Sequence, residues 1–172
     1  MPERFISLFR QQTDALARAW VDGVYADQRT HLPSLLSYRQ LVEHLPEVLE
    51  ELGRLLDSAA SYAEILEAVS RLRFHAQVRF QQGALVDEVA RELIILRGTV
   101  CDFLWREGGS ATEGAIWGLR DALRRTDCFV DELIAQTVLI YAASLRPNVP
   151  TRTSTWPPPR RRKTDFPVSD ER

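Results

Sequence analysis

The sequence predicts an all-α protein, a bundle of five or six helices, on three observations. Apolar residues recur every three or four positions along most of the chain, whereas the alternation typical of strands is nearly absent. Three Ser-x-x-Glu or Ser-x-x-Gln motifs mark helix starts. Of the 172 residues, 45% are hydrophobic and 27% charged, which is typical of a soluble globular domain that can bury its own core.

The first helix is predicted over residues 3–24. Four apolar residues lie along one side of it at helical spacing: Phe5, Phe9, Leu16 and Trp20. The next segment, YADQRTHLPSLL, is polar and contains Pro33, so it is predicted to interrupt the helical pattern.

A second helix is predicted to begin at Ser37, which forms a capping box with Gln40. Its apolar stripe alternates spacings of four and three and consists of Leu41, Leu45, Val48, Leu52 and Leu55. Pro46 lies inside this stripe and has no backbone N–H. We therefore expect it to kink the helix or to mark a new helix start near Leu45.

The third helix begins with the capping box of Ser61 and Glu64, and Gly83 interrupts it. Its stripe consists of Ile65, Val69, Leu72 and Ala76. The fourth helix has a stripe of Leu85, Val89, Leu93, Leu96, Val100 and Phe103. Gly108 and Gly109 are predicted to end it in a left-handed cap.

The last helix begins with the third capping box, Ser110 to Glu113, and runs toward Leu145 over about 36 residues. A helix of that length either breaks within RRTD (124–127) or projects to contact a partner. Its predicted stripe is Ile116, Leu119, Leu123, Val130, Ile134 and Tyr141. Short connections between such helices fit a globin-like packing, in which helices cross ridge into groove.

Pro147 ends the helical part. We therefore expect a folded domain over residues 1–146 and a disordered or polyproline-like tail over residues 147–172. The tail carries six Lys or Arg residues against three acids, a net +3, which leaves −5 for the domain out of the total −2. Its most distinctive residues are Trp156, Arg160, Arg161, Arg162 and Lys163. Such a segment can dock on an aromatic groove, an acidic partner or nucleic acid, but basic runs this short more often only solubilise a chain end.

The total charge does not predict nucleic-acid binding by the domain. The most apolar run, residues 133–143, is too short to cross a bilayer, and the first residues do not resemble a signal peptide. Cys101 and Cys128 fit no disulfide or metal pattern and are expected to be small buried hydrophobic residues. These features predict a cytoplasmic protein without membrane contact.

His75 raises the question of a cofactor, since globins bind haem through a histidine on a helix. It lies about 100° around its helix from Ala76 of the stripe, on a flank with Arg79 and Gln82. Such a histidine is a poor iron ligand, so a structural or hydrogen-bonding role is favoured over haem ligation or pH sensing. No motif for nucleophilic catalysis, metal binding or phosphate binding occurs, so no enzyme activity, metal or cofactor is predicted.

Glu92 and Arg97 lie five positions apart and are either solvated or paired with Arg79 and His75 across facing helices. The four residues form a candidate polar cluster, structural first and sensory second. In GAIWG, Gly114 and Gly118 lie one turn apart and let another helix approach closely. Trp117 and Trp105 can occupy a core or an interface, of which the core is favoured.

Three further segments are LSYRQLVEHLPEVLEEL (36–52), HAQVRFQQG (75–83) and ARELIILR (90–97). In this order they resemble the N-terminal sensory domain of RsbR and RsbRD-type bacterial proteins, which also precedes some sensor histidine kinases. The matching positions are Leu36, Ser37, His44, Leu45, Pro46, Glu47, His75, Ala76, Arg79, Gly83, Glu92, Leu96 and Arg97. The resemblance covers roughly residues 15–146 and departs at Ala84 and Leu93, where an aromatic residue is usual.

This resemblance implies a globin-like domain without haem that dimerises through helices and acts as a signalling input module. Family members pass their output to a STAS domain or a kinase, and we expect no such segment to follow here. We therefore expect a non-enzymatic bacterial signalling or stress-response module, a homodimer that binds a separate STAS-domain or histidine-kinase protein. The alternative is a globin-type sensor of haem or another small ligand.

Overall fold

A computed structural model describes residues 4–108 and 113–145, and this part of the chain is helical with no strand. Its elements are α1 (Arg4–Ala26), α2 (Leu32–Leu35), α3 (Tyr38–Val42), α4 (Leu45–Asp57), α5 (Tyr62–Arg71), α6 (Arg73–Gln81), α7 (Val86–Gly108) and α8 (Glu113–Ser144). Apart from α2 and α3, with four and five residues, every element has nine residues or more. The prediction of an all-α bundle with five or six principal helices is confirmed.

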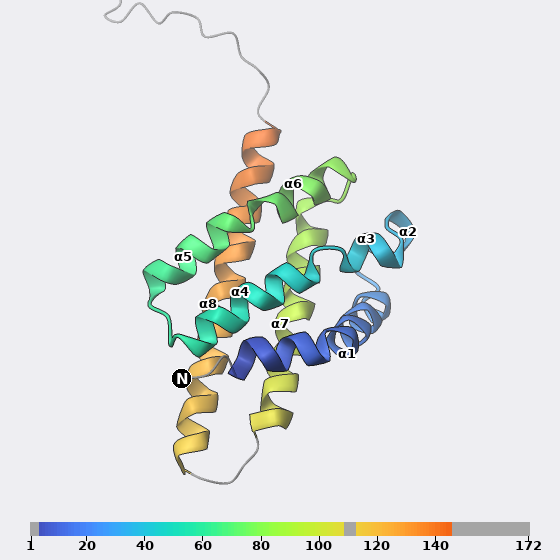
Figure 1. Cartoon of the computed structure of the whole chain (residues 1–172). Coiled ribbons are helices and arrows are strands. Elements are labelled where there is room, and N and C mark those ends of the chain that lie inside the picture. The colour runs from blue at the N-terminus through green and yellow to red at the C-terminus, as the bar shows by residue number, and fades with distance from the viewer. Residues whose placement is uncertain (1–3, 109–112, 146–172) are drawn as a thin grey trace, which may run out of the picture.

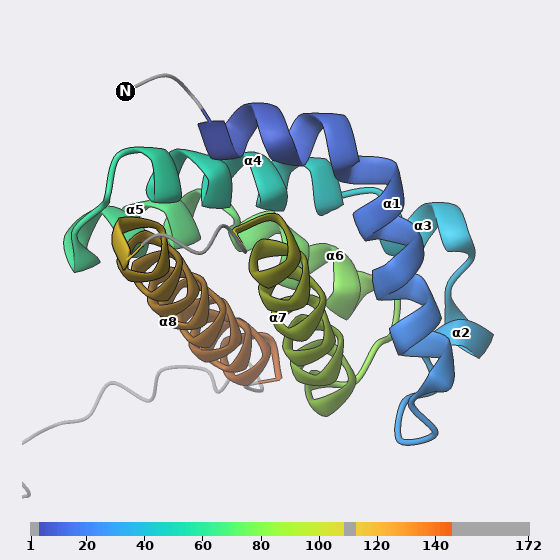
Figure 2. The ribbon, with the colours of Figure 1, turned by 90° about the horizontal axis from the view of Figure 1, so that it is seen from below.

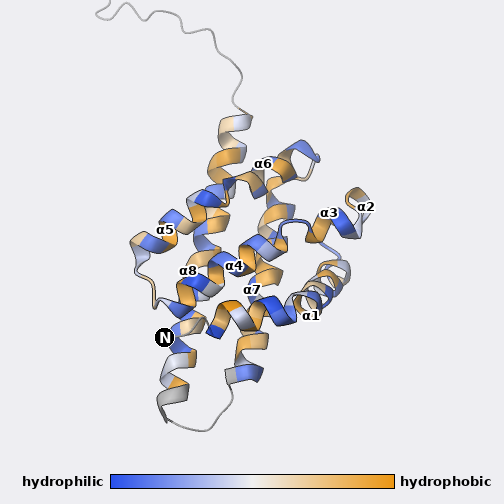
Figure 3. Cartoon of the chain, in the orientation of Figure 1, coloured by the Kyte–Doolittle hydropathy of each residue, from blue (hydrophilic) through white to orange (hydrophobic). Residues whose placement is uncertain are grey.

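The long helices α7 and α8 lie side by side, and α1 and α4 cross them as a second layer (Figures 1 and 2). The helices α5 and α6 pack against α8, and the short α2 and α3 lie beside α1. Hydrophobic and hydrophilic residues alternate around the helices (Figure 3). The apolar sides meet in one core that includes Phe9, Trp20, Leu49, Leu93 and Phe129.

The helix expected over the second apolar stripe restarts at Leu45, as Pro46 predicts. The helix α3 ends at Val42, and α4 begins at Leu45 with the proline in its first turn, where no N–H is needed. All five predicted stripe residues are buried, namely Leu41, Leu45, Val48, Leu52 and Leu55. The capping boxes at Ser37 and Ser61 are both formed.

The third predicted helix is not continuous, because it breaks at Leu72 into α5 and α6. Leu72 has φ −93° and ψ 13°, and its N–H donates to the oxygen of Val69 instead of the residue one full turn back. Neither proline nor glycine marks the break, so the helical pattern gave no sign of it. On α6, His75, which was expected on a flank, is buried together with Arg79.

The last helix runs unbroken for 32 residues through 124–127. Its predicted stripe is only partly correct, because Ile116 is exposed and Leu119, Leu123 and Ile134 are half-buried. The buried side instead includes Ala122, Thr126, Phe129, Leu133 and Thr137. Both threonine hydroxyls donate to a carbonyl four residues back, so they can be buried without an unpaired polar group.

Several predictions concern residues outside the described ranges. These are the capping residue Ser110, Gly109 of the left-handed cap, and the tail over 147–172 with Trp156, Arg160, Arg161, Arg162 and Lys163. Within the described ranges, no helix combines the length and the apolar character that crossing a membrane requires.

Candidate functional site

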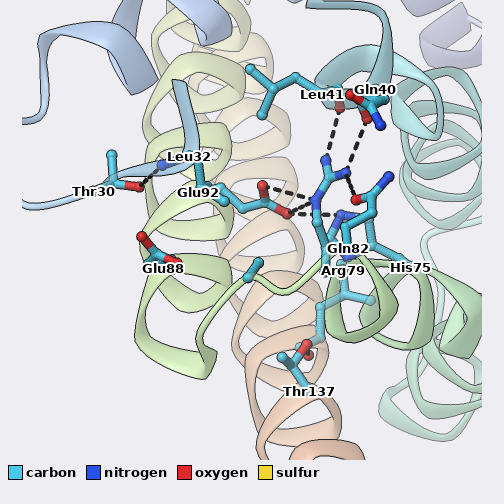
Figure 4. A network of polar contacts seen from close by, with 12 residues as sticks. Thr30, Leu32, Gln40, Leu41, His75, Arg79, Gln82, Glu88, Glu92 and Thr137 are labelled. Atoms are coloured by element: carbon cyan, nitrogen blue, oxygen red, sulfur yellow. Dashed lines mark hydrogen bonds and ion pairs between the residues drawn. The ribbon is translucent and has the colours of Figure 1, made fainter. Parts of the chain in front are cut away.

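An ionic cluster lies in the interior where α3, α6 and α7 meet (Figure 4). Arg79 and Glu92 are both 0% exposed, and His75 is 7% exposed. The Arg79 Nε–H donates to both carboxylate oxygens of Glu92, at 3.0 and 3.1 Å. His75 Nε2 lies 2.9 Å from Oε1 of the same carboxylate. One buried carboxylate therefore binds two basic side chains.

The rest of the Arg79 guanidinium binds the end of α3. Nη1 donates to the backbone oxygen of Gln40 at 3.0 Å and to the side chain of Gln82 at 2.9 Å, and Nη2 donates to the backbone oxygen of Leu41 at 2.9 Å. Carbonyls in the last turn of a helix have no partner within the helix and carry partial negative charge. Arg79 thus donates hydrogen bonds to the carbonyl oxygens at the end of α3, while Glu92 neutralises the positive charge of Arg79.

Glu92 is held as a carboxylate at neutral pH. Burial by itself would raise its pKa, but the hydrogen bond to His75 and the electrostatic interactions with His75 and Arg79 outweigh it, so the pKa of Glu92 lies below its ordinary value. Its backbone oxygen also accepts a hydrogen bond from Trp20 Nε1 at 3.0 Å, which connects α1 to the same point of α7. The cluster therefore joins four helices.

His44 stands next to the cluster, at the start of α4. Its ring packs edge-on against Phe74 and His75, at centroid distances of 4.9 and 6.3 Å. Within the described residues its Nε2 is buried without a hydrogen-bond partner. Burial first, and then the neighbouring His75 and Arg79, lower the pKa of His44 below its ordinary value. His44 is therefore neutral over most of the physiological pH range.

The structure brings together three of the four residues expected in the polar cluster, His75, Arg79 and Glu92. Arg97 is not among them, which corrects that expectation. Its Nη1 lies 2.8 Å from Asp131 and its Nε 3.9 Å from Asp127, both on α8. Five positions on a helix correspond to about 140° of rotation, so Glu92 and Arg97 cannot face the same neighbour.

Sequence reasoning missed the contributions of Gln40, Leu41 and Trp20. The first two take part through backbone oxygens, which leave no trace in the pattern of side chains. Trp20 was identified as an apolar residue of the first helix, and its indole N–H gave a reason to look for an acceptor.

A second feature is an exposed surface on the outer side of α7 and α8. Trp105 and Trp117 are 65% and 58% exposed, so the preference for a core position was wrong, and the interface alternative remains a prediction. Gly118 faces open space, and of Gly114 only the helical backbone is described. Together the exposed residues form what we call the α7–α8 face: Ile94, Gly98, Trp105, Trp117, Arg124, Asp131, Ala135 and Val138.

The two cysteines lie at the flanks of these helices and are half-buried, not fully buried as expected. Burial, followed by the charge of Asp127, raises the pKa of Cys101 to about 11. Burial and the carboxylates of Glu132 and Asp131 also raise the pKa of Cys128. Both are therefore thiols rather than nucleophilic thiolates at neutral pH. The described residues contain no group of three His, Cys, Asp or Glu side chains that could hold a metal.

In a comparison with protein families, the chain matches the model described as the RsbT co-antagonist protein rsbRD N-terminal domain over residues 14–146. The matched segment contains the ionic cluster and both exposed tryptophans. No curated protein and no solved structure matches the chain.

Proposed function

The chain belongs to the family of RsbT co-antagonist protein rsbRD N-terminal domains, a family of stress-response signalling domains, as its sequence resemblance predicted; from this premise we propose that it is a non-enzymatic regulatory module. It acts by binding proteins through the α7–α8 face, first a second copy of itself and then a STAS-domain or histidine-kinase partner. The compartment in which it acts is the bacterial cytoplasm.

The observation that carries the proposal is the uncovered α7–α8 face. The other described helices pack on the opposite side of this helix pair (Figure 2). Two large aromatic side chains of this face, Trp105 and Trp117, remain in solvent. Exposed tryptophans surrounded by polar residues are typical of the few residues that dominate protein–protein binding. Gly98 lies about two turns before Trp105 on α7, and a Cβ there would meet nothing within 4 Å, which leaves room for a close approach.

The ionic cluster supports a regulatory role because it connects the interior to this face through α7. Glu92 points inward to Arg79 and His75, while Arg97 on the same helix pairs with Asp131 of α8, a residue of the face. A change in packing at the α3–α6–α7 junction would therefore move the helix that carries half of the face. A coupling free energy of about 1–3 kcal/mol is sufficient for regulation.

The alternative of a haem sensor does not fit the residues present. His75 Nε2 is bound to the Glu92 carboxylate at 2.9 Å, and the same interior is occupied by the guanidinium of Arg79. Iron coordination through Nε2 would break this contact and leave the carboxylate with one partner fewer in a buried place. Purified protein with an absorbance band near that of haem proteins, lost in His75→Ala, would restore this alternative.

The proposal is tested by the self-association of the full chain and by its binding to a STAS-domain protein, both measured by analytical ultracentrifugation. We expect a dimer, and we expect Trp105→Ala and Trp117→Ala to weaken association roughly 30-fold, the effect of losing about 2 kcal/mol at a central aromatic residue.

Tyr25→Ala is the matched control, because Tyr25 is a comparably exposed aromatic on α1, away from the face. It should leave association unchanged, and all three variants should keep the thermal stability of the parent chain. A monomeric chain that also fails to bind the STAS protein would refute the proposed function.

A further inference from the structure

The outer side of α8 carries a regular seam. Its residues alternate spacings of four and three, the spacing at which two helices pack along a common line: Trp117, Asp121, Arg124, Cys128, Asp131, Ala135, Val138 and Ala142. Each is exposed or half-buried, and together they lie opposite the buried side of Thr126, Phe129 and Thr137. The seam is apolar toward both ends and ionic in the middle.

The seam is complementary to the same seam on a second, antiparallel α8, when the two helices are centred on Cys128. If a second α8 runs antiparallel with the two Cys128 residues at the same level, Trp117 meets Val138 of the other copy, and Asp121 meets Ala135. Arg124 then meets Asp131, and this ion pair occurs twice because of the symmetry. In antiparallel helix pairs, residues on the same flank face each other across the contact, and Arg124 and Asp131 share a flank.

A parallel arrangement has the opposite electrostatic result. It would set Arg124 against Arg124 and Asp131 against Asp131 at the same level, and like charges placed face to face oppose association. Arg124 is exposed and has no ion-pair partner among the described residues, whereas Arg125 is already bound to Asp121 and to the backbone of Ala59 and Ala60. Arg124 is thus a cation of this region that is available to a partner.

We propose that two copies of this chain associate through antiparallel packing of α8 against α8, with Cys128 at the two-fold axis. The proposal rests on the dimer of the proposed function and specifies its geometry. Its distinguishing element is the reciprocal pair of Arg124 and Asp131.

The position of Cys128 is tested by oxidation of the purified full chain with diamide, which accepts two electrons and two protons as two thiols form one disulfide. We expect a disulfide-linked dimer on a non-reducing gel for the parent chain and for Cys101→Ser. The band should be absent for Cys128→Ser, which should still sediment as a dimer, because the bond only reports the proximity that packing creates.

The orientation is tested by charge reversal, with the dimer dissociation constant measured by ultracentrifugation. Arg124→Asp and Asp131→Arg should each weaken the dimer on the order of tenfold, and the double variant should return to within a few-fold of the parent. Asp14→Arg, at an exposed position of α1, is the control and should have no effect. Because Asp131 also pairs with Arg97, thermal unfolding of each variant is measured alongside.

A second readout uses Cys101→Ser/Cys128→Ser chains. Trp117→Cys mixed with Val138→Cys should form a mixed disulfide, whereas Trp117→Cys alone should not. The chain could still form a dimer while the charge reversals have no effect and Trp117→Cys forms a disulfide with itself. That result would overturn the antiparallel arrangement but not the proposed dimer. A chain that is monomeric at all concentrations would overturn both this arrangement and the proposed dimer.

Discussion

Replacing Glu92 with glutamine gives the sharpest test of the interior described above. The substitution keeps the size and shape of the side chain but removes the carboxylate that binds Arg79, a side chain with 0% exposure. Breaking a buried ion pair by removing one partner costs about 3–5 kcal/mol, because the remaining charge is uncompensated. Arg79 keeps its hydrogen bonds to Gln40, Leu41 and Gln82, so we expect the lower end, about 3 kcal/mol.

For a protein of this size, about 3 kcal/mol corresponds to a lower melting temperature by roughly 6–12 °C. The assay is urea unfolding followed by far-UV circular dichroism, with thermal melting as a second measure. Arg97→Gln is the matched control, since its pair with Asp131 is partly exposed and is worth less than about 1 kcal/mol. A loss for Glu92→Gln no larger than that of Arg97→Gln would refute the reasoning.

Three further outcomes are expected. Because burial, His75 and Arg79 lower the pKa of His44 from 6.5, against the opposing charges of Glu43 and Glu47, the unfolded chain binds more protons than the folded one just below that pH. The free energy of unfolding should therefore be fully retained above pH 6.5 and fall as the pH drops through that value. The measurement is urea unfolding between pH 5.5 and 7.5, which lies above the range in which Glu92 titrates. The variant His44→Gln should lose less stability than the parent chain over this range. Since the pKa of Cys101 is about 11, iodoacetamide at pH 8 should alkylate it on the order of a hundredfold more slowly than a free cysteine. The rate is measured by mass spectrometry in the Cys128→Ser variant. A rate equal to that of free cysteine would contradict the burial of Cys101. Ser61→Ala should destabilise the protein by about 1 kcal/mol in urea unfolding through loss of the α5 capping box. The exposed Ser7→Ala, inside α1, is the control and should leave the stability unchanged or raise it by a few tenths of a kcal/mol, because alanine favours a helix over serine.

The sequence predicts most of the helices because their signals are local. Ser37, Ser61 and Pro46 each act within one turn, so their effect can be stated without knowing the fold. The break at Leu72 has no such local signal. His75 and Arg79, on the helix that follows the break, bind the carboxylate of Glu92 on α7, and a periodic pattern does not represent such contacts between helices.

The sequence predicts the chemistry of the candidate site but not all of the residues that form it. A buried charge needs a partner, which was enough to associate Arg79 and His75 with Glu92, and helix rotation was enough to exclude Arg97. The acceptors on Gln40 and Leu41 are backbone oxygens and could not be foreseen. The two exposed tryptophans were misjudged because a large apolar side chain is usually buried, and only the packing of the other helices decides which side stays open.

The buried cluster is costly by design, since an apolar core of the same volume would be at least as stable as a buried ion pair. What the cluster adds is a defined junction, because Arg79 is satisfied only when α3, α6 and α7 are in register. Glu92 and Arg97 lie about 7.5 Å apart along α7, so a shift of that helix alters both the cluster and the pair with Asp131. In the proposed dimer, Asp131 also receives Arg124 of the second copy, and two cations then share one carboxylate. Because Arg97 Nη1 already lies 2.8 Å from Asp131, a movement of α7 that withdraws Arg97 would strengthen the hold of Asp131 on the second copy, which gives the interior a direct electrostatic route to the state of association.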